Sequence, residues 1–260
     1  MRSKSQRQET ILAELRATPA IRIVELAAKF AVSTETVRRD LDELSARGLI
    51  SRTYGGATGT TLPEPLLSDR YLSNQEQRAA MARTLAPLIR NGDSLMIDAG
   101  ATTIFVARRL AAELKDITVV TTSFGVASAL ATNPSIRIRV CPGEYDSRDG
   151  GVTGPDAINY LAQFRVNHAV IGASRLDNDG PSDFNSESVW IKRTMIKQAD
   201  QTILVLDNSK LDKVAFERIA TLGEIDHVVT DMAPSETLTR ALEAAEVTTH
   251  VSGDGAANSE

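Results

Sequence analysis

Apolar positions recur at helical spacing in three stretches of the first fifty residues. The first two predicted helices cover residues 6–17 and 23–30. Their inward-facing side chains are expected to be Ile11, Leu12 and Leu15 in the first helix and Val24, Ala27 and Ala28 in the second. After the second helix, Ala31 and Val32 form a short predicted turn before the third begins.

The third helix is predicted to start at Ser33, whose hydroxyl is a good N-cap, and to stop near Gly48. At about 100° per residue, Val37, Leu41 and Leu44 fall within about 60° of one another and form its buried stripe. Two short helices joined by a tight turn predict a helix-turn-helix.

The outer face of this third helix carries two adjacent arginines. Arg39 is predicted to point outward, and Arg38 to flank the buried stripe. Arginine side chains recognise guanine in the major groove and bind phosphate well. Here the two arginines follow the first turn of the helix, which is the part of a recognition helix that contacts base edges. The expected DNA contacts on this helix are Ser33, Thr34, Glu35, Thr36, Arg38 and Arg39. For the arginines alone, a solvated face with Arg–Glu pairs is an equally good interpretation.

The next stretch, LISRTYGGA at residues 49–57, alternates apolar and polar residues and ends in two glycines, which predicts a small hairpin or wing. Arg52 on this wing is expected to reach DNA phosphate. A DNA-binding domain is therefore predicted over residues 1–57. Residues 58–75 are rich in Thr, Ser and Pro, and Pro63 and Pro65 disfavour a helix, which predicts a linker.

From residue 76 onward, short β-rich runs alternate with helical patterns. The runs are SLMID, ITVVT, IRIRVC, HAVIGAS, TILVLD and HVVTD. This alternation predicts an α/β domain with a largely parallel sheet over residues 76–251. In such domains ligands bind beyond the carboxyl ends of the strands. The small, polar residues 252–260 predict a disordered tail.

Polar and small residues recur where these strands end. The first strand runs into DAGATT, in which a glycine turn leads into a hydroxyl-rich helix start that suits an anion. Ordinary capping by Thr102 or Thr103 is the better explanation of that turn when it is taken alone. Five strand ends of this kind favour one shared pocket. Its expected residues are Asp98, Gly100, Ala101, Thr102, Thr103, Thr121, Thr122, Ser123, Gly143, Glu144, Asp183, Glu187, Asp207 and Lys210.

The composition of this pocket fits a phosphorylated sugar or polyol. Backbone amides, threonine hydroxyls and Lys210 would bind the phosphate, and the carboxylates would accept hydrogen bonds from sugar hydroxyls. Aromatic residues make up only 4% of the chain, so a stacking platform for bases is not expected. The glycine-rich nucleotide-binding patterns are absent, and no cofactor is predicted.

Composition and charge narrow the classes of protein to which the chain can belong. The chain has 260 residues with a net charge of -5, but residues 1–57 carry a balance of +3 and the rest a balance of -8, which hints at a basic nucleic-acid module joined to another domain. No apolar run of eighteen residues and no secretory pattern occurs, so a cytoplasmic protein without a membrane segment is expected. Cys141 is the one cysteine and is expected to be buried. Cysteine and histidine lack the spacing of a zinc site.

The N-terminal segment resembles the DeoR-type transcriptional regulators, and the resemblance covers residues 5–57. The matching positions are Arg7, Ile11, Leu15, Ser33, Thr36, Val37, Arg38, Arg39, Asp40 and Leu41. The wing ends in YGGA, close to the HGGA usual in the family, with Tyr54 in place of the common histidine.

The resemblance continues through the α/β domain and implies a Rossmann-like effector domain similar in fold to ribose-5-phosphate isomerase. The family's DSGTT, TNS, GG and DxSK segments appear here as DAGATT, TTS, PGEY and DNSK. The residues to which the likeness assigns effector binding are Gly100, Thr102, Thr103, Thr122, Ser123 and Lys210. Ala99 and Ala101 remove two hydroxyls from the family pattern, and Thr122 stands in place of an asparagine. These departures leave the identity of the effector open, but not the presence of a pocket.

These observations predict a DNA-binding regulator, not an enzyme, that represses carbohydrate-metabolism genes. The resemblance implies that a phosphorylated sugar or polyol releases it from double-stranded operator DNA, to which it binds as a homodimer or homotetramer. Two other hypotheses stay open at this stage. One is a sugar-phosphate isomerase with Glu144 or Glu187 as general base. The other is a DNA-binding architectural protein without an effector.

Two further expectations concern residues 187–199. Trp190, the only tryptophan, is expected to lie in the core or at a subunit interface. Lys192 and Arg193 are expected to belong to a solvated helix face.

Overall fold

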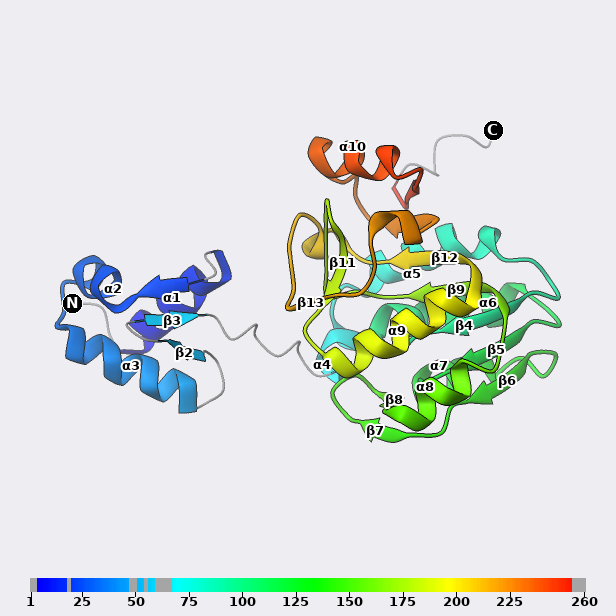
Figure 1. The fold of residues 1–260 in the computed structure, drawn as a ribbon, viewed down its shortest axis with the longest axis horizontal. Coiled ribbons are helices and arrows are strands. Elements are labelled where there is room, and N and C mark those ends of the chain that lie inside the picture. Colours follow the sequence, from blue (N-terminus) through cyan, green and yellow to red (C-terminus); the bar gives the residue numbers. More distant parts are fainter. Residues whose placement is uncertain (1–3, 18–19, 47–50, 54–55, 59–66, 254–260) are drawn as a thin grey trace. The chain divides into compact units, whose positions relative to one another are not determined.

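The computed structural model describes residues 4–17, 20–46, 51–53, 56–58 and 67–253 (Figure 1). The chain divides into two units, Met1–Glu64 and Pro65–Glu260, which are described one at a time. The first, for which the sequence predicts DNA binding, is called the DNA-binding unit below, and the second, for which it predicts effector binding, the sensor unit.

The described residues of the DNA-binding unit form three helices and a small sheet. Its elements in order are α1 (Lys4–Ala17), β1 (Ala20–Arg22), α2 (Ile23–Phe30), α3 (Thr34–Ala46), β2 (Ser51–Thr53) and β3 (Gly56–Thr58). The predicted hairpin is confirmed as β2 and β3, and β1, which the sequence pattern did not predict, pairs antiparallel with β3. The predicted stop at Gly48 and the side chain of Leu15 lie outside the described residues.

The core of this unit confirms the predicted stripe of α3 and corrects the predicted face of α2. Val37, Leu41 and Leu44 are completely buried, as is Ile11 of α1. In α2, however, the side chains that point inward are Ile23, Leu26 and Ala27, whereas Val24 is 69% exposed and Ala28 is also exposed. The prediction was wrong by one residue because an eight-residue helix permits either phase, and the larger apolar side chains occupy the core.

The sensor unit is built on a seven-stranded parallel sheet, which confirms the predicted fold class. The strands are β4 (Ser94–Ile97), β5 (Thr118–Thr121), β6 (Arg137–Val140), β9 (Val166–Ile171), β12 (Ala199–Val205), β14 (His227–Thr230) and β15 (Thr248–Val251). Their spatial order is β15-β14-β12-β9-β4-β5-β6. The order reverses at β4, which places a topological switch point between β4 and β9.

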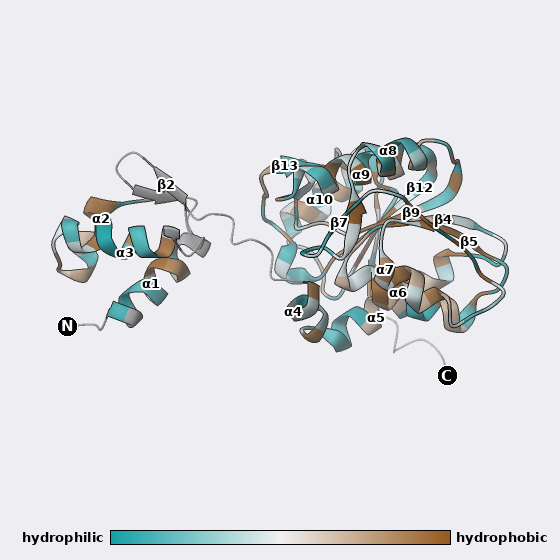
Figure 2. Cartoon of the chain, turned by 90° about the horizontal axis from the view of Figure 1, so that it is seen from below, coloured by the Kyte–Doolittle hydropathy of each residue, from teal (hydrophilic) through white to brown (hydrophobic). Residues whose placement is uncertain are grey.

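Helices cover both faces of this sheet. One layer contains α5 (Gln75–Leu85), α6 (Ala101–Glu113) and α7 (Phe124–Leu130), and the other contains α8 (Pro155–Leu161), α9 (Ser186–Gln198) and α10 (Glu236–Ala244). Leu95 and Ile97 pack against the first layer and Met96 against the second, as the alternation of a strand requires. Figure 2 shows the hydrophobic residues concentrated in and beside the strands.

Short strands are added where the main strands end. After β6 comes a hairpin of β7 (Glu144–Asp146) and β8 (Gly151–Thr153), and after β9 come β10 (Arg175–Asp177) and β11 (Gly180–Asp183), to which β13 (Glu217–Arg218) adds. Within residues 67–253 there are also three single-turn 3-10 helices, at Ala86–Leu88, Asn208–Lys210 and Leu222–Glu224. These excursions carry several of the predicted site residues.

Part of the predicted linker is structured. Residues Leu67–Leu72 form helix α4, although this stretch was expected to join the domains without a helix. The helix forms because Tyr71 packs on Phe105 of α6, with ring centroids 5.4 Å apart. The two prolines lie before its first residue, so they do not interrupt it.

The structure also decides three expectations about single residues of the sensor unit. Cys141 is buried, as predicted. Trp190 is 55% exposed, so it does not lie in the core, and its place at a subunit interface stays a prediction; the guanidinium of Arg193 lies 5.0 Å from its ring centre. Lys192 is only 5% exposed, so the solvated face predicted for it was also wrong. Within the described part of the chain, none of the helices combines the length and apolar character needed to cross a bilayer.

Candidate DNA interface and sensor site

Helix α3 is positioned as the second helix of a helix-turn-helix. Ala31 ends α2 in the left-handed conformation, at φ 52°, and its backbone N–H donates to carbonyls of the last turn. Ser33 caps α3, because its hydroxyl accepts a hydrogen bond from the backbone N–H of Thr36 at 3.1 Å. The Thr36 hydroxyl lies 2.9 Å from the same oxygen, so both hydroxyls stabilise the first turn.

The outward face of α3 presents the two arginines beside one carboxylate. Arg38 and Arg39 are 57% and 77% exposed and lie 3.7 Å and 3.6 Å from Glu35. Exposed ion pairs of this kind contribute about 0–1 kcal/mol, so a DNA phosphate competes with Glu35 easily. Thr34 and Glu35 are also exposed in the first turn. The surface therefore fits a solvated face, because the Arg–Glu pairs are present, and it also fits a DNA-binding face, because those pairs are weak.

Asp40, on the same helix, has a structural task instead. It is almost completely buried, and its carboxylate accepts hydrogen bonds from the guanidinium of Arg7 on α1, one of them at 3.1 Å. This bidentate pair fixes α1 across α3. The backbone of Arg52 lies in β2, and its side chain lies outside the described residues, so its DNA contact stays a prediction.

In the sensor unit, the predicted residues after β4 and β5 lie next to each other at the switch point. The backbone N–H of Asp98 donates to the carbonyl of Val170 on β9 at 3.0 Å. Strand β8 contacts both loops. The backbone N–H of Val152 donates to the carbonyl of Thr122, and Gly151 lies so close to Ala99 that a Cβ atom added to the glycine would be 2.5 Å from the Cβ of Ala99. The structure thus brings together Asp98, Gly100, Ala101, Thr102, Thr103, Thr121, Thr122 and Ser123.

Several hydroxyls of this group already bind within the protein. The Thr121 hydroxyl donates to the carbonyl of Ile97 at 2.7 Å, and the Ser123 hydroxyl caps α7 by accepting from Val126 at 3.3 Å. The Thr103 hydroxyl donates to the carbonyl of Gly100 at 2.9 Å. The Thr102 hydroxyl accepts from the guanidinium of Arg78 at 3.2 Å, but this side chain is partly exposed on the first turn of α6, which makes it the hydroxyl of that turn best placed for a ligand.

A buried charge cluster lies directly beneath this loop. The ammonium of Lys192 on α9 hydrogen-bonds the carboxylate of Asp183 at the end of β11 and lies 3.5 Å from that of Asp98. Asp183 also accepts hydrogen bonds from the Ser174 hydroxyl at 2.7 Å and the Phe184 amide at 2.8 Å. All three charged side chains are at most 5% exposed.

The two carboxylates of this cluster have opposite pKa shifts. Burial raises the pKa of Asp98 to about 6, and the charge of Lys192 opposes that rise only in part. Burial also acts on Asp183, but the charge and hydrogen bonds of Lys192 outweigh it and lower the pKa of Asp183 to about 2. The two carboxylates raise the pKa of Lys192 far above its ordinary value despite burial. At neutral pH the cluster therefore holds one positive and two negative charges.

The remaining predicted residues surround this edge less closely. The exposed Glu187 accepts a hydrogen bond from the Thr153 hydroxyl at 2.7 Å, and Glu144 pairs with Thr153 across β7 and β8. Asp207 is buried and accepts from Ser209, while the ammonium of Lys210 donates to the carbonyl of Ala173 at 3.0 Å.

Gly143 has a positive φ of 144°. A Cβ there would lie 2.5 Å from the carbonyl oxygen of Thr153, so the turn requires glycine.

Sequence reasoning missed three charged residues around this edge, namely Lys192, Arg78 and Asp149. For Lys192 a signal existed, because it lies three residues after Val189 and three before Met195, on the apolar stripe of α9. Arg78 and Asp149 have no comparable pattern, since Arg78 meets Thr102, and Asp149 meets Arg70, only in the folded unit. Among the described residues, no three side chains of His, Cys, Asp or Glu are grouped so that they could hold a metal ion.

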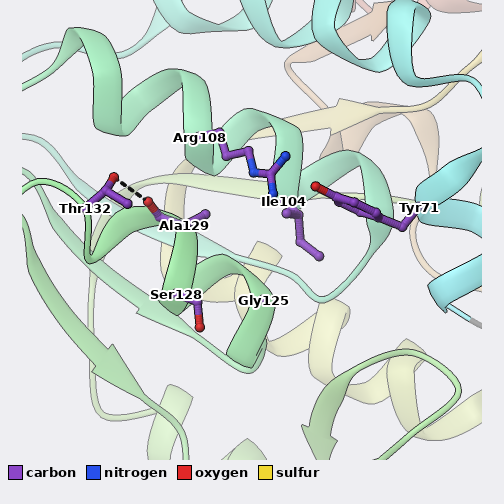
Figure 3. Close-up of a pocket in the computed structure, with 7 residues that line it drawn as sticks. All are labelled: Tyr71, Ile104, Arg108, Gly125, Ser128, Ala129 and Thr132. Atoms are coloured by element: carbon purple, nitrogen blue, oxygen red, sulfur yellow. Dashed lines mark hydrogen bonds between the residues drawn. The ribbon is translucent and has the colours of Figure 1, made fainter.

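A separate cleft of about 450 Å³ lies between α4, α6 and α7 (Figure 3). Its walls are formed by Tyr71, Ile104, Arg108, Gly125, Ser128, Ala129 and Thr132. None of the predicted effector residues lines it.

Comparisons with known proteins agree with this division of the chain. A family described as the DeoR-like helix-turn-helix domain matches residues 7–61, and one described as the DeoR C terminal sensor domain matches residues 73–232. The glycerol-3-phosphate regulon repressor of Escherichia coli (strain K12) is 33% identical over 244 residues, covering 92% of this chain and 95% of that protein. The HTH-type transcriptional repressor GlcR of Bacillus subtilis (strain 168) is 32% identical, covering 90% of each chain.

Among solved structures, a D-ribose-5-phosphate isomerase in complex with phospho-erythronic acid aligns with a TM-score of 0.40 and 19% identity, over 53% of this chain and 54% of that one. Likeness at this level says nothing about chemistry.

With these matches over nearly the whole chain, the class is a two-domain transcriptional regulator with a DNA-binding and a sensor domain. The chain belongs to the DeoR family. Its relatives are repressors and not enzymes, so the isomerase hypothesis is set aside.

Proposed function

We propose that this protein represses genes of carbohydrate or polyol-phosphate metabolism by binding operator DNA through α3, and that a phosphorylated sugar or polyol bound at the carboxyl edge of the sensor sheet releases it. The observation that carries the proposal is the meeting of the β4 and β5 loops above a buried charge cluster, within a chain that also contains a helix-turn-helix.

The start of α6 would bind the phosphate of the effector. This thirteen-residue helix begins directly after Gly100, so its first backbone N–H groups are free for an anion, and Thr102 adds a partly exposed hydroxyl. Lys210, half-buried at the end of the neighbouring 3-10 helix, would add a positive charge. The effector role of each of these residues is part of the proposal.

The carboxylates would select the remainder of the effector. One oxygen of Asp98 accepts from the Ala99 amide at 2.7 Å, whereas the other has only long contacts, with the Gly172 amide at 3.4 Å and the Lys192 ammonium at 3.5 Å. This second oxygen is therefore the best acceptor in the cluster for a ligand hydroxyl. A phosphate at one end and a hydroxyl at the other describe a small polyol phosphate. The name of the Escherichia coli relative, a repressor of a glycerol-3-phosphate regulon, supports this class.

DNA binding would take place in the cytoplasm and require two copies of α3. Helix-turn-helix proteins read half-sites roughly 34 Å apart or at a multiple of that distance, so we propose that the protein acts as a homodimer or homotetramer. Thr34, Glu35 and the two arginines of α3 would meet base edges and phosphates.

Thermal unfolding of the purified protein tests the effector class. Glycerol 3-phosphate, ribose 5-phosphate and related esters are compared with their unphosphorylated parents. A true effector at a hundred times its dissociation constant should stabilise the protein by about 2.7 kcal/mol, which raises the unfolding midpoint by several degrees. If the parents stabilise the protein as strongly as the esters, the phosphate site proposed at α6 is wrong.

A further inference from the structure

Helix α4 is fastened to the candidate sensor site by two largely buried arginines, Arg70 and Arg78. It begins at Leu67, close to the unit boundary between Glu64 and Pro65, so among the described residues it is the first element of the sensor unit to follow the DNA-binding unit in the sequence. A conformational change that is transmitted along the chain from one unit to the other therefore has to pass through the first residues of α4.

Arg78 joins the end of α4 to the first turn of α6. It is 4% exposed, and its guanidinium donates to the backbone carbonyls of Arg70 and Ser73. The same guanidinium donates to the hydroxyl of Thr102 at 3.2 Å. A ligand that takes the Thr102 hydroxyl as a partner therefore changes a hydrogen bond that holds α4.

Arg70 joins α4 to the start of α9. Its guanidinium lies 2.7 Å from the carboxylate of Asp149, and both side chains are less than 20% exposed. The other oxygen of Asp149 accepts from Asn185 at 3.1 Å and from the Ser188 hydroxyl at 3.2 Å. Lys192, which pairs with Asp98, lies one turn further along α9 and is within electrostatic reach of Asp149.

Packing also holds α4 against the segment around Asp149 and against α6. The backbone N–H of Leu67 donates to the carbonyl of Arg148 at 2.9 Å, and a Cβ on Gly150 would lie 2.1 Å from the Leu67 side chain. On the other side, Tyr71 stacks on α6 with the guanidinium of Arg108 5.2 Å from its ring centre (Figure 3). The helix therefore contacts the segment around Asp149 and the first turns of α6 at once.

We infer that α4 is the element through which occupancy of the sensor site is transmitted toward the DNA-binding unit, and that the Arg70–Asp149 ion pair is the contact that couples it to the site. The inference rests on the proposed function, because it presupposes an effector at the switch point. A ligand shifts an equilibrium only when it contacts the two states differently, and here Thr102 and Lys192 are the residues whose partners a ligand would change.

The alternative is that the ion pair merely stabilises the sensor unit. Two variants of the full-length protein separate these roles: Arg70→Met removes the cation, and Asp149→Asn keeps an oxygen that can accept from Asn185 and Ser188. For each, titration calorimetry gives the affinity for glycerol 3-phosphate, or for whichever ester of the panel stabilises the wild type. Fluorescence anisotropy on DNA from upstream of the gene gives the operator affinity with and without that compound.

We expect both variants to bind the compound and the free operator within about threefold of the wild type. The compound should weaken operator binding by roughly 5- to 150-fold in the wild type, and by less than threefold in either variant. The double variant should lose no more coupling than each single variant, because both remove the same contact. Arg165→Met, which breaks an exposed ion pair with Asp200 in the same unit, should respond as the wild type does.

Release of both variants at the wild-type concentration of compound would overturn the inference, and so would loss of compound binding in both variants with unchanged unfolding midpoints. A wild type that the compound does not release would contradict the proposed function itself, whatever the variants do. The wild-type titration therefore tests the function, and the variants test the coupling.

Discussion

At the scale of single residues, the charge of the sensor unit is concentrated in the cluster of Lys192, Asp98 and Asp183. One ammonium serves two buried carboxylates, and it is closer to Asp183 than to Asp98. This unequal sharing explains why the pKa of Asp183 falls to about 2 while that of Asp98 rises to about 6. The cluster is therefore held together by Lys192 and leaves Asp98 the less satisfied acceptor.

Replacing Lys192 by Met leaves two buried carboxylates without a cation. We expect the free energy of unfolding to fall by about 3–5 kcal/mol at pH 8, where both are ionised. The loss should be smaller at pH 5, because the pKa values of both carboxylates rise in the variant and protonation removes the buried charge. Urea unfolding at the two pH values measures this.

Lys197→Met, at an exposed position of the same helix, is the matched control and should change little at either pH. A loss in Lys192→Met that is equal at pH 5 and pH 8 would show that packing, and not charge, is what Lys192 contributes.

Asp98 should make the stability of the wild type depend on pH. Its pKa in the folded protein, about 6, is above the ordinary value of 3.8, so the folded state binds the proton more tightly than the unfolded state. Its contribution to stability is then fully present below pH 3.8 and is lost as the pH rises through 6. The two pKa values imply a contribution of about 3 kcal/mol.

Asp98→Asn removes this titration, so its free energy of unfolding should fall less than that of the wild type between pH 4 and pH 7. Urea unfolding at intervals of half a pH unit measures both curves. Parallel curves would show that Asp98 does not carry the shifted pKa.

At the scale of elements, α3 separates what stabilises the fold from what binds DNA. Its inner face supplies Val37, Leu41 and Leu44 to the core, and Asp40 binds Arg7. The outer arginines make only exposed contacts with Glu35. Substitutions on the two faces should therefore have different consequences.

Arg39→Ala should leave the unfolding midpoint almost unchanged, because an exposed ion pair contributes little. Operator binding should weaken by about 1–3 kcal/mol if Arg39 reads a base. Anisotropy on operator DNA measures the affinity, with Arg240→Ala in an exposed pair of α10 as the control. Wild-type affinity in Arg39→Ala would mean that this arginine does not contact the DNA.

Helices and strands could be predicted where the pattern of apolar residues repeats over enough positions. The stripe of α3 and the alternation of strands and helices repeat over many residues, so periodicity was sufficient. In α2 the eight residues allowed two phases, and tertiary packing selected Ile23, Leu26 and Ala27. Strands such as β7 and β8 have three residues each, too few for a pattern.

The candidate site was predicted in part, for a related reason. Strand ends were recognisable in the sequence, and parallel strands bring them to one edge. The sequence could not show which hydroxyls form hydrogen bonds within the protein, because Thr121 and Ser123 meet their partners only in the folded structure. The buried state of Lys192 required Asp183, which lies on a separate short strand.

At the scale of the whole molecule, one chain combines a basic DNA-binding segment with an acidic sensor segment. The charge balance is +3 over residues 1–57 and -8 over the remainder. Because phosphate contacts release counterions, operator binding should weaken steeply as salt is raised. The acidic remainder would repel DNA, which favours contact through the DNA-binding unit.

The most direct test of the account is a fluorescence anisotropy titration of the full-length protein on DNA from upstream of its own and neighbouring genes, repeated with glycerol 3-phosphate, ribose 5-phosphate and their unphosphorylated parents. The account predicts tight, salt-sensitive binding that one phosphorylated compound releases and its parent does not. Specific binding that none of the compounds changes, or equal release by ester and parent, would contradict it.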